Sequence, residues 1–126
     1  MNIFIQTDKI IIIILTLNED LKLINRTIFE ETLKKLKQFE GVKGVIVTNI
    51  EGLPISSTYE TEQTEKIAAH ITSLVGKCKN VVNSLKNSED DVMSFITITT
   101  KDGEILVAPE EEYILIVQKE HGVQIF

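Results

Sequence analysis

The sequence is poor in the residues on which metal binding and disulfide formation depend. Its 126 residues include one cysteine, Cys78, together with two histidines, two prolines and no tryptophan. A single cysteine cannot form an internal disulfide, and two histidines and one cysteine without ligand spacing cannot build a structural zinc site. The composition therefore argues against a disulfide-stapled secreted domain and against a zinc module.

Basic charge is also scarce. The chain has 13 lysines and arginines against 19 acidic residues, which gives a net charge of -6. Such a surface does not attract phosphate backbones over distance. The sequence also contains no glycine-rich phosphate-binding loop. We therefore expect no nucleic-acid partner, no nucleotide hydrolysis and no cofactor.

The few reactive side chains are badly placed for catalysis. His70 and Cys78 fall on one predicted helix, where eight residues separate them by about 12 Å, which is beyond hydrogen-bond reach. His121 stands alone near the end of the chain, and the acidic clusters at 89–91 and 110–112 lack the glycine-punctuated pattern of a calcium loop. The sequence predicts that this protein is not an enzyme.

What the chain does have is enough apolar sequence for one domain. Hydrophobic residues make up 43% and charged residues 25%, as in soluble globular proteins. A block of five isoleucines lies within Lys9–Leu17, but it is shorter than the roughly 20 apolar residues that span a bilayer, and Asp8 stands where a signal peptide needs basic charge. We expect no membrane insertion, and we treat residues 1–26 as an extension of unknown role.

The first half of the domain is predicted to contain a helix and a hairpin. Apolar residues at helical spacing between Glu19 and Phe39 favour a helix that ends at Phe39 and begins at about Thr27 or earlier. Gly41 ends it, and β-branched strands follow at 45–49 and 53–58. The turn between them, "NIEG", places Asn49 and Gly52 where positive φ is tolerated. Pro54 cannot donate to a ladder, so the second strand should lie at a sheet edge.

A long helix is predicted at about 61–84, with Thr61 and Thr64 as candidate caps. A second stripe of small or polar residues runs beside the apolar stripe of this helix. We favour a helix–helix contact at this second stripe, since small residues let another backbone approach. The alternative is that the stripe is a plain solvent face. The predicted core stripe comprises Ile67, Ile71, Leu74, Val75, Cys78, Val82 and Leu85. The second stripe comprises Ala69, Thr72, Ser73, Gly76, Lys79, Asn80 and Asn83.

The last third is predicted to be a meander of three strands at 92–100, 104–108 and 113–119, with a tight turn at 101–103. Weak alternation in several strands indicates that both sheet faces are covered. The fold class is an α/β sandwich of order helix-β-β-helix-β-β-β, with one helix on each face or both on one. If the last strand pairs with the strand at 45–49, the strand at 92–100 becomes a free edge without proline or lysine, and such an edge invites a strand from another chain.

Two segments carry a family resemblance. "GVKGVIVTNIEGLPISST" and "EILVAPEEEYILIVQ" closely resemble the roadblock family of dynein light chains, over about Ile28 to Lys119. The resemblance implies a mainly antiparallel five-stranded sheet at 27–120, followed by a short tail at 121–126. It also implies a homodimer, or a heterodimer with a paralogue, in which two sheets form one continuous sheet.

The resemblance further implies a function. Family members are non-catalytic light chains of the dynein motor that bind its intermediate chain and support cargo attachment and motor assembly in microtubule-based transport. That role places the protein in the cytoplasm on the microtubule cytoskeleton, or in a cilium. Related domains act as scaffolds or regulators of small GTPases, which is the alternative. The implied dimer interface comprises Ala69, Thr72, Ser73, Gly76, Lys79 and Asn80 on the helix and Phe95, Ile96, Thr97, Ile98 and Thr99 on the strand.

Overall fold

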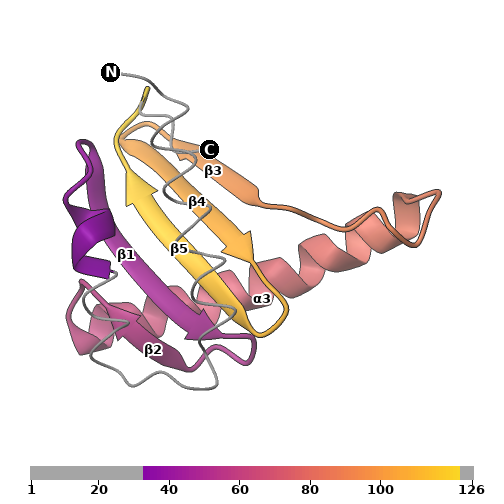
Figure 1. Cartoon of the computed structure of the whole chain (residues 1–126), viewed down its shortest axis with the longest axis horizontal. Coiled ribbons are helices and arrows are strands. Elements are labelled where there is room, and N and C mark those ends of the chain that lie inside the picture. The colour runs from indigo at the N-terminus through magenta and orange to yellow at the C-terminus, as the bar shows by residue number, and fades with distance from the viewer. Residues whose placement is uncertain (1–32, 123–126) are drawn as a thin grey trace.

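The computed structural model describes residues 33–122, which form a five-stranded antiparallel sheet crossed by one long helix (Figure 1). The strand order is β2-β1-β5-β4-β3. This order confirms the predicted fold class and the pairing of the last strand with the first. The elements are β1 (Val42–Asn49), β2 (Pro54–Ser57), α3 (Thr61–Leu85), β3 (Ile96–Thr100), β4 (Gly103–Pro109) and β5 (Tyr113–Lys119).

The predicted first helix is seen in part, because residues 33–37 are helical. Its earlier residues, the predicted extension at 1–26 and the last four residues of the chain lie outside the described part. Among residues 33–122, no helix is both long and apolar enough to cross a membrane.

The β1–β2 hairpin has the predicted place at the sheet edge, with Pro54 in the edge strand. Its turn differs in one respect from the expectation. Gly52 has a positive φ of 94°, whereas Asn49 does not. The Asn49 side chain instead accepts hydrogen bonds from the backbone N–H groups of Glu51 at 2.9 Å and Leu53 at 3.0 Å. Asparagine therefore shapes this turn through its amide oxygen, while glycine provides the unusual backbone conformation.

The core has two halves, one on each face of the sheet. On one face, Leu33 and Leu36 pack against alternate residues of the central strands, including Val45 and Val117. On the other face, α3 packs through Ile71 and Val75 on a cluster that the intervening strand residues form: Ile46, Val107, Ile114 and Ile116. Because successive strand residues point to opposite faces, strands covered on both sides are apolar throughout. The structure thus settles an open alternative, since one helix lies on each face.

The start of α3 differs from the predicted caps. Glu60 precedes the helix and makes no side-chain capping hydrogen bond. The Thr64 hydroxyl lies inside the first turns, is buried, and donates a hydrogen bond of 2.7 Å to Ser57 Oγ on β2. Thr64 therefore ties the helix to the edge strand instead of capping it.

The predicted core stripe of α3 is correct only for its first half. The buried residues of the helix end at Val75, and Leu85 is 75% exposed. Figure 1 shows the reason, because the second half of α3 projects beyond the sheet. A 25-residue helix is about 37 Å long, whereas five strands about 4.8 Å apart make the sheet that it crosses only about 20 Å wide. The apolar stripe of α3 therefore continues past Val75, where no part of the sheet covers the helix.

The edge strand β3 is shorter than the predicted strand at 92–100. It begins at Ile96, and residues 92–95 run back from the end of α3 without strand pairing. This returning segment lies next to the projecting part of the helix and diverges from the last residues of β4 (Figure 1). Phe95, which the resemblance placed on the pairing strand, accordingly precedes it.

Candidate dimer interface

The outer edge of β3 is open to another strand. Within residues 33–122, β3 pairs only with β4, from Ile96 opposite Val107 to Thr100 opposite Gly103. Ile96 and Ile98 are partly buried and pack toward the α3 side of the sheet, so the alternate residues Thr97 and Thr99 lie on the other face and are exposed. The strand contains neither proline nor lysine. Its backbone groups are therefore accessible to a second strand.

The small-residue stripe of α3 divides between two environments. Ala69, Ser73, Gly76 and Asn80 are exposed, and a Cβ built on Gly76 would meet no atom within 4 Å. No contact within the described chain thus explains a glycine that costs about 1 kcal/mol in a helix interior. These residues leave room for a second backbone.

Thr72 and Lys79 lie instead on the flank of α3 that faces the loops of the sheet. The Thr72 hydroxyl oxygen lies 3.3 Å from the position of a Cβ built on Gly52 in the β1–β2 turn. This oxygen is buried and is the one such atom of the described part without a hydrogen-bond partner. Lys79 lines a groove together with residues 92–94 and 109–111. The structure thus separates the predicted helix residues into a solvent face and a loop-facing flank.

Of the apolar residues of the overhang, that is, of the second half of α3 with the returning segment at 92–95, the predicted interface included only Phe95. Six large hydrophobic residues of the described chain are exposed, and four of them lie on the second half of α3 or on the returning segment: Val81, Leu85, Val92 and Phe95, between 49% and 75% exposed. A concentration of this kind is a mark of an interaction surface. The signal was available in the sequence, because the predicted helix is longer than five adjacent strands are wide.

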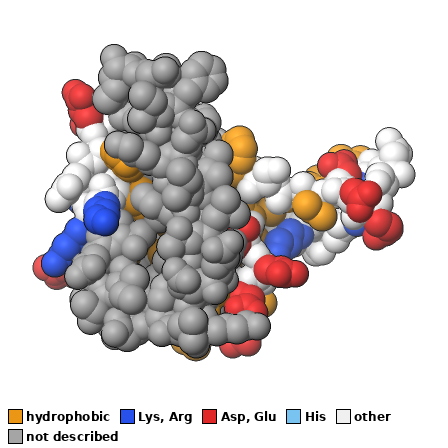
Figure 2. All heavy atoms as spheres, in the orientation of Figure 1, with side chains coloured by type: hydrophobic (Ala, Val, Ile, Leu, Met, Phe, Trp, Pro, Cys, Tyr) orange, Lys and Arg blue, Asp and Glu red, His pale blue; other side chains and the backbone are white. Residues whose placement is uncertain are grey.

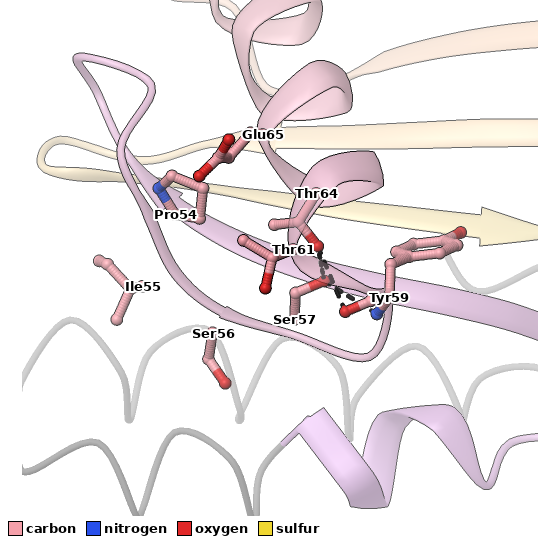
Figure 3. A pocket seen from close by; sticks show the side chains of 8 residues that line it. All are labelled: Pro54, Ile55, Ser56, Ser57, Tyr59, Thr61, Thr64 and Glu65. Atoms are coloured by element: carbon pink, nitrogen blue, oxygen red, sulfur yellow. Dashed lines mark hydrogen bonds between the residues drawn. The ribbon is translucent and has the colours of Figure 1, made fainter.

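Among the described residues 33–122, no reactive set of side chains comes together. A shallow pocket of about 270 Å³ lies between β2 and the start of α3, and it contains Ser57, Tyr59 and Thr64 (Figure 3). The Ser57 and Thr64 hydroxyls bond to each other rather than to a base. His121 Nε2 lies 2.9 Å from the Lys101 carbonyl oxygen. Cys78 belongs to α3, a different element of the fold. Across residues 33–122, no group of three histidine, cysteine or acidic side chains could hold a metal ion.

Comparison with known families matches this architecture. The Roadblock/LC7 domain model matches residues 28–119, which is most of the chain. The chain belongs to the Roadblock/LC7 family. The resemblance drawn from the hairpin and from "EILVAPEEEYILIVQ" is thereby confirmed at the level of the family.

Solved structures of Roadblock/LC7 proteins share the fold. MglB from Myxococcus xanthus superposes with a TM-score of 0.68 at 14% identity, covering 79% of this chain and 74% of that one. A Roadblock/LC7 domain from Streptomyces avermitilis gives 0.65 at 12% identity, covering 71% and 76%. The gliding protein MglB from Thermus thermophilus gives 0.64 at 9% identity, covering 79% and 77%. At these identities the likeness is one of fold.

Proposed function

We propose that this Roadblock/LC7 protein is a non-catalytic adaptor that works as a dimer of two identical chains. The observation that carries the proposal is the overhang: four of the six exposed large hydrophobic residues of the described chain gather there, beside the open edge of β3. Exposed apolar area of this kind gains about 25 cal/mol per Å² when a partner covers it. A second copy supplies both a strand for the edge and a helix for the overhang.

The proposed dimer is isologous. Two β3 strands pair antiparallel across a two-fold axis, which makes one continuous sheet from two five-stranded ones. The exposed small residues Ser73, Gly76 and Asn80 let the two α3 helices approach closely. Val81 and Leu85 point away from these small residues, at about 140° and 180° from Gly76 around the helix, so other parts of the partner chain cover them. A single two-fold axis thus relates both the pair of β3 strands and the pair of α3 helices.

The partner that the sequence favours is a segment of a dynein intermediate chain. Support comes from the closeness of "GVIVTNIEGLPI" and "VAPEEEYILIV" to dynein light chains of the roadblock type. In this role the dimer presents a composite surface that neither chain has alone, and partner binding stabilises the dimer by mass action. The protein then acts in the cytoplasm on microtubules, or in a cilium, where it supports motor assembly and cargo attachment.

A scaffold or regulator of a small GTPase is the second candidate. The fold is shared with bacterial proteins, among them the two MglB proteins. A fold shared this widely does not by itself favour the motor role over regulation of a small GTPase. The dimer is common to both candidates, whereas the bound partner distinguishes them.

Gly76→Arg tests the proposal. The Cβ of residue 76 has free space around it, so the single chain accommodates arginine, but two close helices cannot. We expect monomers by light scattering and loss of partner capture from cell extract, with dynein chains or GTPases identified by mass spectrometry. The matched control is Gln63→Arg, which adds the same charge to an exposed position in the first turns of α3. A Gly76→Arg protein with the mass of a dimer would refute the proposed interface.

A further inference from the structure

The projecting end of α3 carries an exposed loop. The helix ends at Leu85, and residues 86–91 reverse the direction of the chain before the returning segment begins. This loop lies at the far end of the overhang, away from the sheet (Figure 1). Ser88 and the three residues that follow it are all exposed. A loop of this kind can enter the active site of a modifying enzyme while the core of the domain stays folded.

The hydrogen bonds of Ser88 stay within this loop. Its Oγ accepts a hydrogen bond from the Asp90 N–H at 3.2 Å, and its carbonyl oxygen accepts one from the Asp91 N–H, also at 3.2 Å. Lys86 Nζ lies 3.5 Å from a carboxylate oxygen of Glu89, whose side chain is 96% exposed, so this ion pair adds little stability. These contacts are local, and extending the loop breaks none of the hydrogen bonds of the sheet.

The sequence after Ser88 is acidic at three successive positions, Glu89, Asp90 and Asp91. Figure 2 shows acidic side chains gathered at this end of the molecule. Protein kinases choose their substrates partly by the pattern of charge around the acceptor hydroxyl. Carboxylates on the C-terminal side of the acceptor fit a kinase whose substrate groove is basic at those positions, because complementary charges favour the encounter and fix the register.

The other described hydroxyl residues with an acidic residue three positions later lie in strands. There are four such residues in the described chain, of which Ser88 is one. The others are Thr48 in β1, which is completely buried, Ser57 in β2 and Thr99 in β3. Each of these three has a single acidic residue among its next three positions, and each would have to leave the sheet to reach an active site. Among the described hydroxyl residues, Ser88 alone combines three following acidic residues with an exposed position outside helices and strands.

We infer that Ser88 is a phosphorylation site for a protein kinase that selects acidic residues on the C-terminal side of its acceptor serine. In this reaction Ser88 Oγ forms a bond to the γ-phosphorus of ATP, the bond from that phosphorus to the β,γ-bridging oxygen breaks, and ADP leaves. The hydroxyl proton passes to the catalytic base of the kinase. The site lies beyond the last residue of α3 and uses neither the edge of β3 nor the solvent face of the helix, so it does not depend on the proposed dimer.

A phosphate on Ser88 changes the charge at the tip of the overhang. The loop at 86–91 contains one lysine and three acidic residues, a formal charge of -2, and a phosphate adds about -1.5 to -2 at neutral pH. Lys86 already pairs with Glu89, so the phosphate and this carboxylate compete for one cation. Phosphorylation thus nearly doubles the negative charge of the loop, which attracts basic surfaces of partners and repels acidic ones.

Phosphorylation of the purified 126-residue chain tests the site. The probe is a recombinant kinase that selects acidic residues after its acceptor, supplied with ATP, and mass spectrometry locates the phosphate. We expect phosphate on Ser88 in the wild-type chain and no phosphate in this loop in Ser88→Ala. The matched control is Ser84→Ala, which removes a hydroxyl inside α3 that donates a hydrogen bond to the Asn80 carbonyl oxygen, and it should keep the phosphate on Ser88. A wild-type chain without phosphate on Ser88 would overturn the inference.

Neutralising two of the acidic residues tests the selectivity. Glu89→Gln with Asp91→Asn should slow phosphorylation of Ser88 roughly tenfold, since two exposed charge pairs with the kinase are lost. The matched control, Glu111→Gln with Glu112→Gln, removes the same charge from exposed positions of the β4–β5 turn and should stay within about twofold of wild type. Equal rates in the two double variants would contradict recognition through the acidic residues after Ser88.

The Gly76→Arg variant separates this site from the proposed dimer. Because the loop lies beyond the helix, this variant should accept phosphate on Ser88 within about twofold of the wild-type rate. Phosphorylation of a wild-type chain that is monomeric by light scattering refutes the dimer and leaves the site standing. Phosphate on the Gly76→Arg monomer but not on the wild-type dimer would show that a second copy covers the loop, which overturns the inference.

Discussion

The centre of the sheet and the projecting end of α3 are built from similar residues but in opposite environments. In the centre, Ile46 and Val107 are completely buried between the two layers. At the projecting end, Leu85 and Val92 are at least 70% exposed. The sequence of α3 does not change its apolar periodicity between the two regions. What changes is whether the sheet extends far enough to cover the helix, so burial alone distinguishes a core residue from an interface residue here.

Truncating one side chain in each region should show the largest difference. Ile46→Ala removes a buried side chain and leaves a cavity, so it should lower the free energy of unfolding by about 2–5 kcal/mol. Leu85→Ala should lower it by less than about 0.5 kcal/mol in a monomeric background such as Gly76→Arg. Chemical denaturation of the two proteins in that background measures both values. Similar losses would mean that Leu85 is buried within its own chain.

Substitutions of Gly44 in the sheet and Gly76 in α3 test the same comparison between the two regions, with smaller expected changes in the free energy of unfolding. A Cβ on Gly44 in β1 would collide with the Tyr59 ring, so Gly44→Ala should cost about 1–3 kcal/mol through overpacking. Gly76→Ala meets no atom and should stabilise the monomer by up to about 1 kcal/mol. Thermal unfolding at low protein concentration measures both changes. A destabilising Gly76→Ala under those conditions would show that the helix is already packed there.

The smallest expected effect is the contribution of Tyr59 to the pH dependence of stability. Its hydroxyl donates a hydrogen bond to Gln118 Oε1 on β5, and burial raises its pKa above the ordinary value of about 10. The folded chain therefore keeps this proton at pH values where the unfolded chain loses it, and stability falls as pH rises through about 10. In Tyr59→Phe that contribution is absent, so the variant should lose less stability than wild type between neutral pH and above pH 10. An identical alkaline loss in both proteins would contradict this assignment.

Much of the fold follows from local sequence signals. Pro54 predicted an edge strand, and the β-branched runs predicted strands covered on both faces, as β1 and β5 are. Strand order followed from one assumed pairing between 45–49 and the last strand. These features follow from the spacing of apolar residues and from the missing N–H group of proline, and both can be read from a single sequence.

The remaining features depend on distances that no single segment reveals. The predicted strand at 92–100 is paired only from Ile96, opposite Val107, although β4 continues to Pro109, because residues 92–95 leave the sheet toward the end of α3. The α3 core stripe loses its cover beyond Val75. Thr72 and Lys79 face the loops because the β1–β2 and β4–β5 turns both reach the helix. Comparing the length of the helix with the width of a five-stranded sheet in advance would have identified the overhang.

The molar mass of the wild-type chain in solution tests the central claim most directly. Light scattering across a range of concentrations should give twice the chain mass of 14.2 kDa, falling toward a single chain only on strong dilution. A mass of one chain at every concentration would contradict the account, because the open strand edge and the apolar overhang would then remain in water.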